Sequence, residues 1–303
     1  MQSRRVRALA LLTCLLSLGV VGVSAYLRLS GAGLGCDGWP ACYGSILSGS
    51  VAAPWEGARL VHRLVATSAL LAGILLAWRC WRPQPLQPAA RYATLLLALM
   101  LFLSVVGIWS ADPRLVVVNF INLVGGLGLV SFSRRVAITS EPGRWVERGQ
   151  GGTVCRLALA SLTLTVLLGG LIGARYAAPA CGTLPACEGA WWPAAQGWVA
   201  LNPLAVLSGP PEPGEAGGVA LHLLHRYAAV LAAVLLSIVA LRLRKVPQAR
   251  NAALVTLTIL LLEGLVGVLT VASGYSLWLA VAHNVGAALL LAAAASLMHS
   301  VRQ

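Results

Sequence analysis

Charged residues are scarce in this 303-residue chain. Asp, Glu, Lys and Arg make up 10% of it, against 58% hydrophobic residues, and the mean hydropathy is +0.82. A water-soluble domain carries about 25% charged residues, and a soluble fold this apolar would expose large hydrophobic patches. The composition therefore excludes a soluble protein and predicts an integral membrane protein that is surrounded by lipid.

Acidic residues are the rarest of the charged types, with nine Asp and Glu against 22 Lys and Arg, which gives a net charge of +13. A basic balance of this size often indicates a nucleic-acid partner. The basic residues form no continuous stripe, however, and lie in short clusters between apolar runs. Such loop charge orients a membrane protein, so we predict no nucleic-acid partner.

The long apolar runs also lack the alternation of a transmembrane β-strand, which excludes a barrel as the main plan. A helix needs roughly 20 residues to cross a hydrocarbon layer of ~30 Å. Eight runs are long enough, near residues 8–28, 57–78, 92–110, 114–133, 155–175, 219–241, 252–272 and 277–298. The predicted fold class is an all-α integral membrane protein with eight transmembrane helices.

Lys and Arg cluster before the first predicted span and after the second, fourth and sixth. By the positive-inside rule these loops and both termini are cytoplasmic, so we expect a multi-pass protein of the cell (inner or plasma) membrane. The basic-then-apolar N-terminus is also typical of a signal peptide. We interpret it as a retained first span, because its counterpart at 155–175 lies in the middle of the chain.

The chain contains an internal repeat. Each half has an apolar run, a Cys-x5-Cys loop and then a His-Arg pair near the start of the next apolar run. The repeated residues are Cys36, Cys42, His62 and Arg63 in the first half, and Cys181, Cys187, His225 and Arg226 in the second. We therefore predict two pseudo-symmetric four-helix bundles, at residues 1–145 and 146–303.

Both cysteine pairs, Cys36–Cys42 and Cys181–Cys187, fall in predicted extracytoplasmic loops. That compartment is oxidising, so two local disulfides are expected. They are either staples that stiffen the loops or redox-active dithiols beside a cofactor. No Cys-x-x-Cys-His occurs, which argues against covalent c-type haem attachment.

Three histidines lie at one depth in the predicted spans. His62, His225 and His283 are five or six residues from the outer end of their spans, roughly 8–9 Å deep at 1.5 Å per residue. Polar groups in a membrane are costly and indicate function. Equal depth on different helices favours axial ligands of buried haem over zinc, which needs four converging ligands. The alternative is that these histidines only join helices by hydrogen bonds.

The second half offers a complete ligand pair. We predict that His225 and His283 bind one haem between the sixth and eighth spans, and two strong ligands favour electron transfer over oxygen chemistry. His222 lies one turn before His225 and either supports a ligand by a hydrogen bond or pairs with a propionate. Arg226 and Arg63 each follow a histidine, and either reach propionates or extend to the membrane interface.

The first half is less complete. When the two half-sequences are aligned, Asn122 takes the position that His283 has in the second half. Asn is a poor iron ligand. His62 is then the only obvious protein ligand, and the site either leaves one iron position open or has decayed. Arg59 precedes His62 by three residues on the same helical face and is placed to pair with a propionate.

Several stretches together resemble the haem A synthase family, the eight-span enzymes of cytochrome oxidase assembly. The stretches are Tyr26–Gly44, Leu168–Leu171, Pro185–Gly189, His225-Arg226, Glu263–Thr270 and Leu277–His283. The resemblance implies oxidation of a ring methyl of haem O to a formyl group, giving haem A. It also implies a haem b held by His225 and His283, and a substrate haem beside His62.

The resemblance implies partners as well: a haem O-producing enzyme, cytochrome oxidase assembly proteins and an external electron donor, with homo-oligomerisation left open. Two positions depart from the family pattern. Arg59 replaces the usual Glu, and Asn122 replaces the usual His, both in the half where catalysis is expected. We predict His62 and Arg59 as the catalytic residues. Because of the two departures, two alternatives stay open: a non-catalytic membrane haem-binding protein for assembly or transfer, and a haem b electron carrier.

Overall fold

A computed structural model describes residues 2–34, 40, 42, 44, 56–140, 152–209 and 212–300. It has eight helices long and apolar enough to span a membrane, and the described residues contain no β-sheet, only isolated bridges. The spanning helices are α1 (Gln2–Gly31), α3 (Glu56–Trp81), α4 (Ala89–Val106), α5 (Val116–Thr139), α6 (Gly152–Ala174), α7 (Ala216–Leu243), α8 (Arg250–Ala272) and α9 (Leu277–Ser300). All eight predicted spans are confirmed.

The helices extend beyond the predicted spans at several ends. Helix α1 begins at Gln2, six residues before the predicted start, because its backbone stays helical through the basic residues that precede the apolar run. Helix α4 ends earlier, at Val106, and the chain continues as the 3₁₀ helix η1 (Gly107–Ala111). Many outward-facing side chains are large and apolar, such as Leu261 at 73% exposure, as expected for a surface in contact with lipid.

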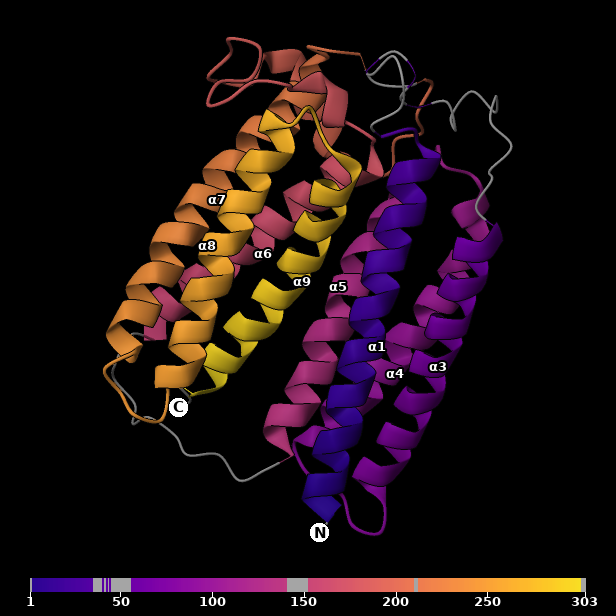
Figure 1. Ribbon diagram of the computed structural model, residues 1–303, viewed down its shortest axis with the longest axis vertical. Helices are drawn as coiled ribbons and strands as arrows, with labels where there is room; N and C mark the ends of the chain where they lie inside the picture. Colours follow the sequence, from indigo (N-terminus) through magenta and orange to yellow (C-terminus); the bar gives the residue numbers. More distant parts are fainter. Residues whose placement is uncertain are drawn as a thin grey trace.

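The helices pack in two groups of four, as Figure 1 shows: α1, α3, α4 and α5 on one side, and α6 to α9 on the other. Each group encloses its own apolar core. The first core includes Val6, Leu76, Leu96 and Val136, and the second includes Leu162, Leu236, Leu260 and Leu297. The predicted domain boundary after residue 145 lies outside the described residues, so that division stays a prediction.

Helices α1, α5, α6 and α9 form the seam between the two groups. On α1, Arg28 donates to the Gly173 carbonyl of α6 at 3.0 Å and to the Asn284 Oδ1 of α9 at 3.3 Å. Toward the other end of the seam, Arg134 Nε of α5 donates to Ser296 Oγ of α9 at 2.8 Å. The seam is thus held by polar contacts near both ends.

Both chain ends lie at the same end of the bundle (Figure 1), as an even number of spans requires. The opposite end, which we call the cap end, carries η2 (Ala178–Ala180), η3 (Ala195–Leu201) and the loop 181–187. Helix η3 packs on α7, and the Leu207 N–H donates to the Arg114 carbonyl at 3.1 Å, which joins the cap to the first group. That the cap end is extracytoplasmic stays a prediction from loop charge.

Candidate functional site

Two imidazole rings approach each other between α7 and α9. The ring centres of His225 and His283 are 6.4 Å apart, and the ring planes are nearly perpendicular, at 89°. Both residues lie in the half of their helix nearer the cap end. The structure therefore brings together the two histidines that the sequence predicts as one ligand pair.

The spacing of these rings fits one metal ion between them. A metal–imidazole nitrogen bond is about 2.0–2.1 Å long. Two nitrogens across one ion are then about 4 Å apart, and the ring centres lie roughly 1 Å beyond each nitrogen, about 6 Å apart in total. No group of three or more His, Cys, Asp or Glu that could hold a metal ion occurs among the described residues. Haem iron, which needs only axial protein ligands, fits a two-histidine site better than zinc does.

The Nδ1 atoms of the two imidazoles each lie next to a polar group of a neighbouring helix. His225 Nδ1 lies 2.9 Å from the Thr165 carbonyl oxygen of α6, and a protonated Nδ1 that donates there leaves Nε2 free for a metal. His283 Nδ1 lies 3.1 Å from Glu263 Oε1 of α8, although the angle of this contact does not meet that of a hydrogen bond. Each ring is thus supported by a neighbouring helix in the way that metal-ligating histidines usually are.

Two glycines bring those supporting helices close. A Cβ added at Gly169 of α6 would lie 3.0 Å from His225 Cε1, and one at Gly267 of α8 would lie 3.1 Å from His283 Cε1. Both distances are shorter than the ordinary carbon–carbon contact of about 3.5–4.0 Å. Because Gly169 and Gly267 have no side chain, each imidazole can pack directly against the backbone of the neighbouring helix.

His222 has a different environment. It is buried, with 6% exposure, and its Nε2 lies 2.9 Å from the Ala177 carbonyl oxygen. Its ring meets the Tyr275 ring edge-on at 6.2 Å, and the Tyr275 hydroxyl donates to the Cys181 carbonyl. His222 thus ties α7 to the cap, and its predicted contact with a cofactor remains a prediction.

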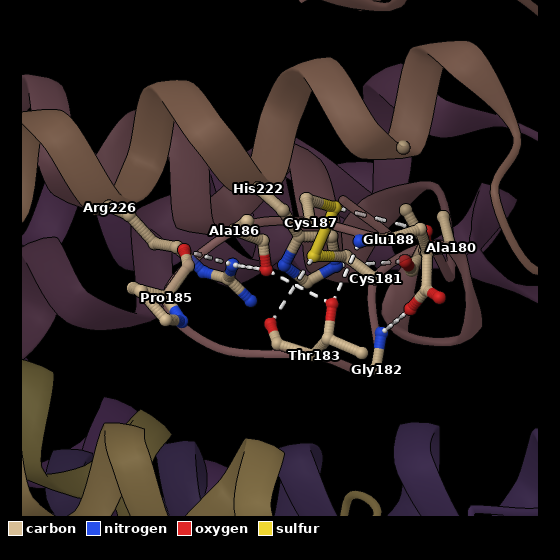
Figure 2. Close-up of a disulfide and its surroundings, with 12 residues drawn as sticks. Ala180, Cys181, Gly182, Thr183, Pro185, Ala186, Cys187, Glu188, His222 and Arg226 are labelled. Atoms are coloured by element: carbon tan, nitrogen blue, oxygen red, sulfur yellow. Dashed lines mark hydrogen bonds between the residues drawn. A yellow bond between two sulfur atoms is a disulfide. The ribbon is translucent and has the colours of Figure 1, made fainter. Parts of the chain in front are cut away.

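Arg226 links α7 to the loop 181–187 (Figure 2). Its Nη1 donates to the carbonyls of Pro185 at 3.1 Å and Ala186 at 3.2 Å. Its Nη2 is buried without a hydrogen-bond partner among the described residues, as is Nη1 of Arg175, which follows α6. Guanidinium groups bind carboxylates well, so these free donors suit anionic groups such as propionates. Arg175 was not predicted as a site residue, and its one sequence signal is an arginine directly after an apolar run.

The loop 181–187 is closed by a disulfide between Cys181 and Cys187, whose Cα atoms are 5.1 Å apart. Figure 2 shows it beside His222 and Arg226. The Gly182 N–H donates to Glu188 Oε1 at 2.9 Å, which ties the start of the loop to the residue that follows it. Cys42 is also disulfide-bonded, whereas Cys36 lies outside the described residues. Cys14, Cys80 and Cys155 are free.

The site residues that the sequence predicts in the first half do not form a cluster like that of the second half. His62 is partly exposed on α3, and Arg59 and Arg63 are exposed on the same helix. Asn122 is partly buried on α5. The His62 ring makes no hydrogen bond and no ring contact with the part of the chain that the structure describes. Among the described residues, no second imidazole faces His62 as His283 faces His225.

Comparison with known proteins gives consistent matches. The family model described as cytochrome oxidase assembly protein (COX15-CtaA) matches residues 7–57 and 122–295, which include His225 and His283 but not His62. A heme A synthase of Shewanella oneidensis is 30% identical over 307 residues, covering 92% of each chain. A heme A synthase of Novosphingobium aromaticivorans is 30% identical over 258 residues, covering 79% of this chain and 69% of that protein. The chain therefore belongs to the cytochrome oxidase assembly protein family that includes these heme A synthases.

Proposed function

We propose that this protein is a membrane oxidoreductase that converts haem O to haem A by oxidising a ring methyl to a formyl group. Its relatives named heme A synthase support the reaction. The observation that carries the proposal is the pair of imidazoles with ring centres 6.4 Å apart, because this spacing suits two axial ligands of one haem iron.

The proposed cofactor is a haem b between α7 and α9, which the imidazoles of His225 and His283 would hold. When bound, it supplies a one-electron carrier. The Thr165 carbonyl orients the His225 ring, and the unpaired nitrogens of Arg226 and Arg175 provide positive charge for the propionates. These residues would hold and orient a redox centre between membrane-spanning helices.

The proposed substrate site lies in the first half, beside His62. Because α3 is largely exposed to lipid, a hydrophobic haem reaches this helix from the membrane. A single histidine leaves the opposite face of the substrate iron without a protein ligand. Arg59 offers positive charge on the cap-end side of His62, where the propionates of the substrate would meet water, and Arg63 adds a second positive charge directly after His62.

The proposal also sets the protein in its surroundings. A haem O-producing enzyme supplies the substrate, cytochrome oxidase assembly proteins receive the product, and an external donor exchanges electrons with haem b. We place the protein in the cell membrane, with both termini in the cytoplasm and the cap end outside. Loop charge supports this orientation.

Expression in cells that make haem O but lack a haem A synthase tests the proposal. Pigments extracted from the purified protein should contain haem A and haem B. His62→Ala should abolish haem A and keep a low-spin haem spectrum, whereas His225→Ala and His283→Ala should abolish that spectrum. His299→Gln, near the other end of α9, serves as the matched control and should change neither.

The alternatives give different pigments. Haem B alone, at one per chain, would indicate a non-catalytic assembly or transfer protein. Two low-spin haems b per chain would indicate an electron carrier. A preparation without Soret absorbance, from cells well supplied with haem, would exclude all three functions.

A further inference from the structure

Glu263 is an isolated acidic residue inside the membrane. Among the described spanning helices only α3 and α8 contain an acidic residue, and that of α3 is Glu56, its first residue. Glu263 lies in the middle of α8, with its side chain 11% exposed. A carboxylate in this position is expensive, and such residues usually serve a function.

The carboxylate of Glu263 is directed at one neighbour. Its Oε1 lies 3.1 Å from His283 Nδ1, and this is the one charged or polar contact that the carboxylate makes among the described residues. One turn along α9, Gly286 leaves the space that the carboxylate occupies, because a Cβ there would overlap Glu263. Helices α8 and α9 are therefore shaped to hold this carboxylate against this imidazole.

The two imidazoles of the pair have unlike partners. His225 Nδ1 faces a neutral backbone carbonyl, that of Thr165, whereas His283 Nδ1 faces a carboxylate. A carboxylate partner fixes the ring orientation and raises the basicity of a metal-ligating histidine. Hydrogen bonding behind the axial ligand is one of the means by which proteins set haem potentials.

We propose that Glu263 is the positioning residue of His283. In the haem-bound protein its carboxylate, which lies 3.1 Å from Nδ1, would accept a hydrogen bond from that nitrogen, keep Nε2 directed at the iron and lower the reduction potential of the haem that His225 and His283 would hold. This inference rests on the proposed function, because it assumes that these two histidines hold a haem b.

Three variants test the role of Glu263, with the midpoint potential of the low-spin haem as the readout. Glu263→Gln keeps the size and an acceptor oxygen but removes the carboxylate, and should raise the potential. We expect at least a tenfold shift in the redox equilibrium, which is about 59 mV for one electron. Gly286→Ala should shift the potential in the same direction, because the new Cβ displaces the carboxylate. The control, Gly264→Ala, adds its Cβ to open space beside Glu263 and should leave the potential unchanged.

Each outcome separates this inference from the proposed function. A wild-type protein without low-spin haem contradicts the proposed function before any variant is made. Unchanged potentials in Glu263→Gln and Gly286→Ala, with haem bound, overturn the role of Glu263 and leave the proposed function standing. Loss of haem from Glu263→Gln, with helix content and gel-filtration volume unchanged, supports the positioning role.

Discussion

One methyl group placed beneath each imidazole tests whether the rings need their observed positions. The changes are Gly169→Ala on α6 and Gly267→Ala on α8. The new Cβ atoms would lie 3.0 Å from His225 Cε1 and 3.1 Å from His283 Cε1. An ordinary contact is about 3.5–4.0 Å, so ring and helix must separate by roughly 0.5–1 Å.

The size of the effect follows from that displacement. Overpacking of a tight contact typically costs about 1–3 kcal/mol. A haem iron held by both imidazoles would fix the distance between them, so this cost would fall on the haem-bound state. At about 1.4 kcal/mol per tenfold, each variant should bind haem roughly 5- to 150-fold more weakly. The spanning helices should still form, since neither change affects the apolar surfaces that face lipid.

Transfer of haem from the purified protein to an excess of apomyoglobin in detergent measures this loss. Gly264→Ala is the matched control, because its Cβ meets nothing within 4 Å on the helix that carries Gly267. If Gly169→Ala and Gly267→Ala both retain haem as tightly as the wild type, the glycines do not set the ligand positions, and the reasoning is refuted.

Two further predictions concern residues around the site. Arg28→Met removes two hydrogen bonds across the seam, each worth about 1.5–3 kcal/mol because the donor is charged, and should lower the thermal unfolding midpoint in detergent. Arg5→Met, at an exposed position of α1, is the control and should leave the midpoint unchanged. Equal midpoints for the two variants would show that the seam does not depend on Arg28. His222→Leu leaves the Ala177 carbonyl without its partner, at a cost of about 1–3 kcal/mol, and should lower the same midpoint while the low-spin spectrum remains; loss of the spectrum would instead give His222 a direct part in haem binding.

The spanning helices and the meeting of His225 with His283 could be predicted from the sequence for a physical reason. A membrane requires long, nearly uncharged runs, and these stand out in a chain with so few charges. His225 and His283 share a depth in their spans, and depth in a membrane follows directly from position in a run. Their pairing required that two helices of the same half, α7 and α9, face each other across the group between α6 and α8.

The residues that surround His225 and His283 could not be predicted in the same way. The Thr165 carbonyl is a backbone atom, and Gly169 contributes by lacking a side chain, so neither has a chemical signature in the sequence. The sequence marks Glu263 only as part of a stretch that resembles the family, because its contact with His283 depends on how α8 and α9 rotate against each other. The free guanidinium nitrogen of Arg175 likewise depends on how the cap folds over the end of α6.

The polar contacts at the seam also restrict how a large ligand enters the protein. Arg28 secures α1 to α6 and α9 near one end, and Arg134 secures α5 to α9 toward the other. Separating the two groups of helices would expose these guanidinium groups to hydrocarbon, which is costly. We therefore expect a bulky planar molecule to enter sideways through the lipid-facing wall of either group rather than between the two groups.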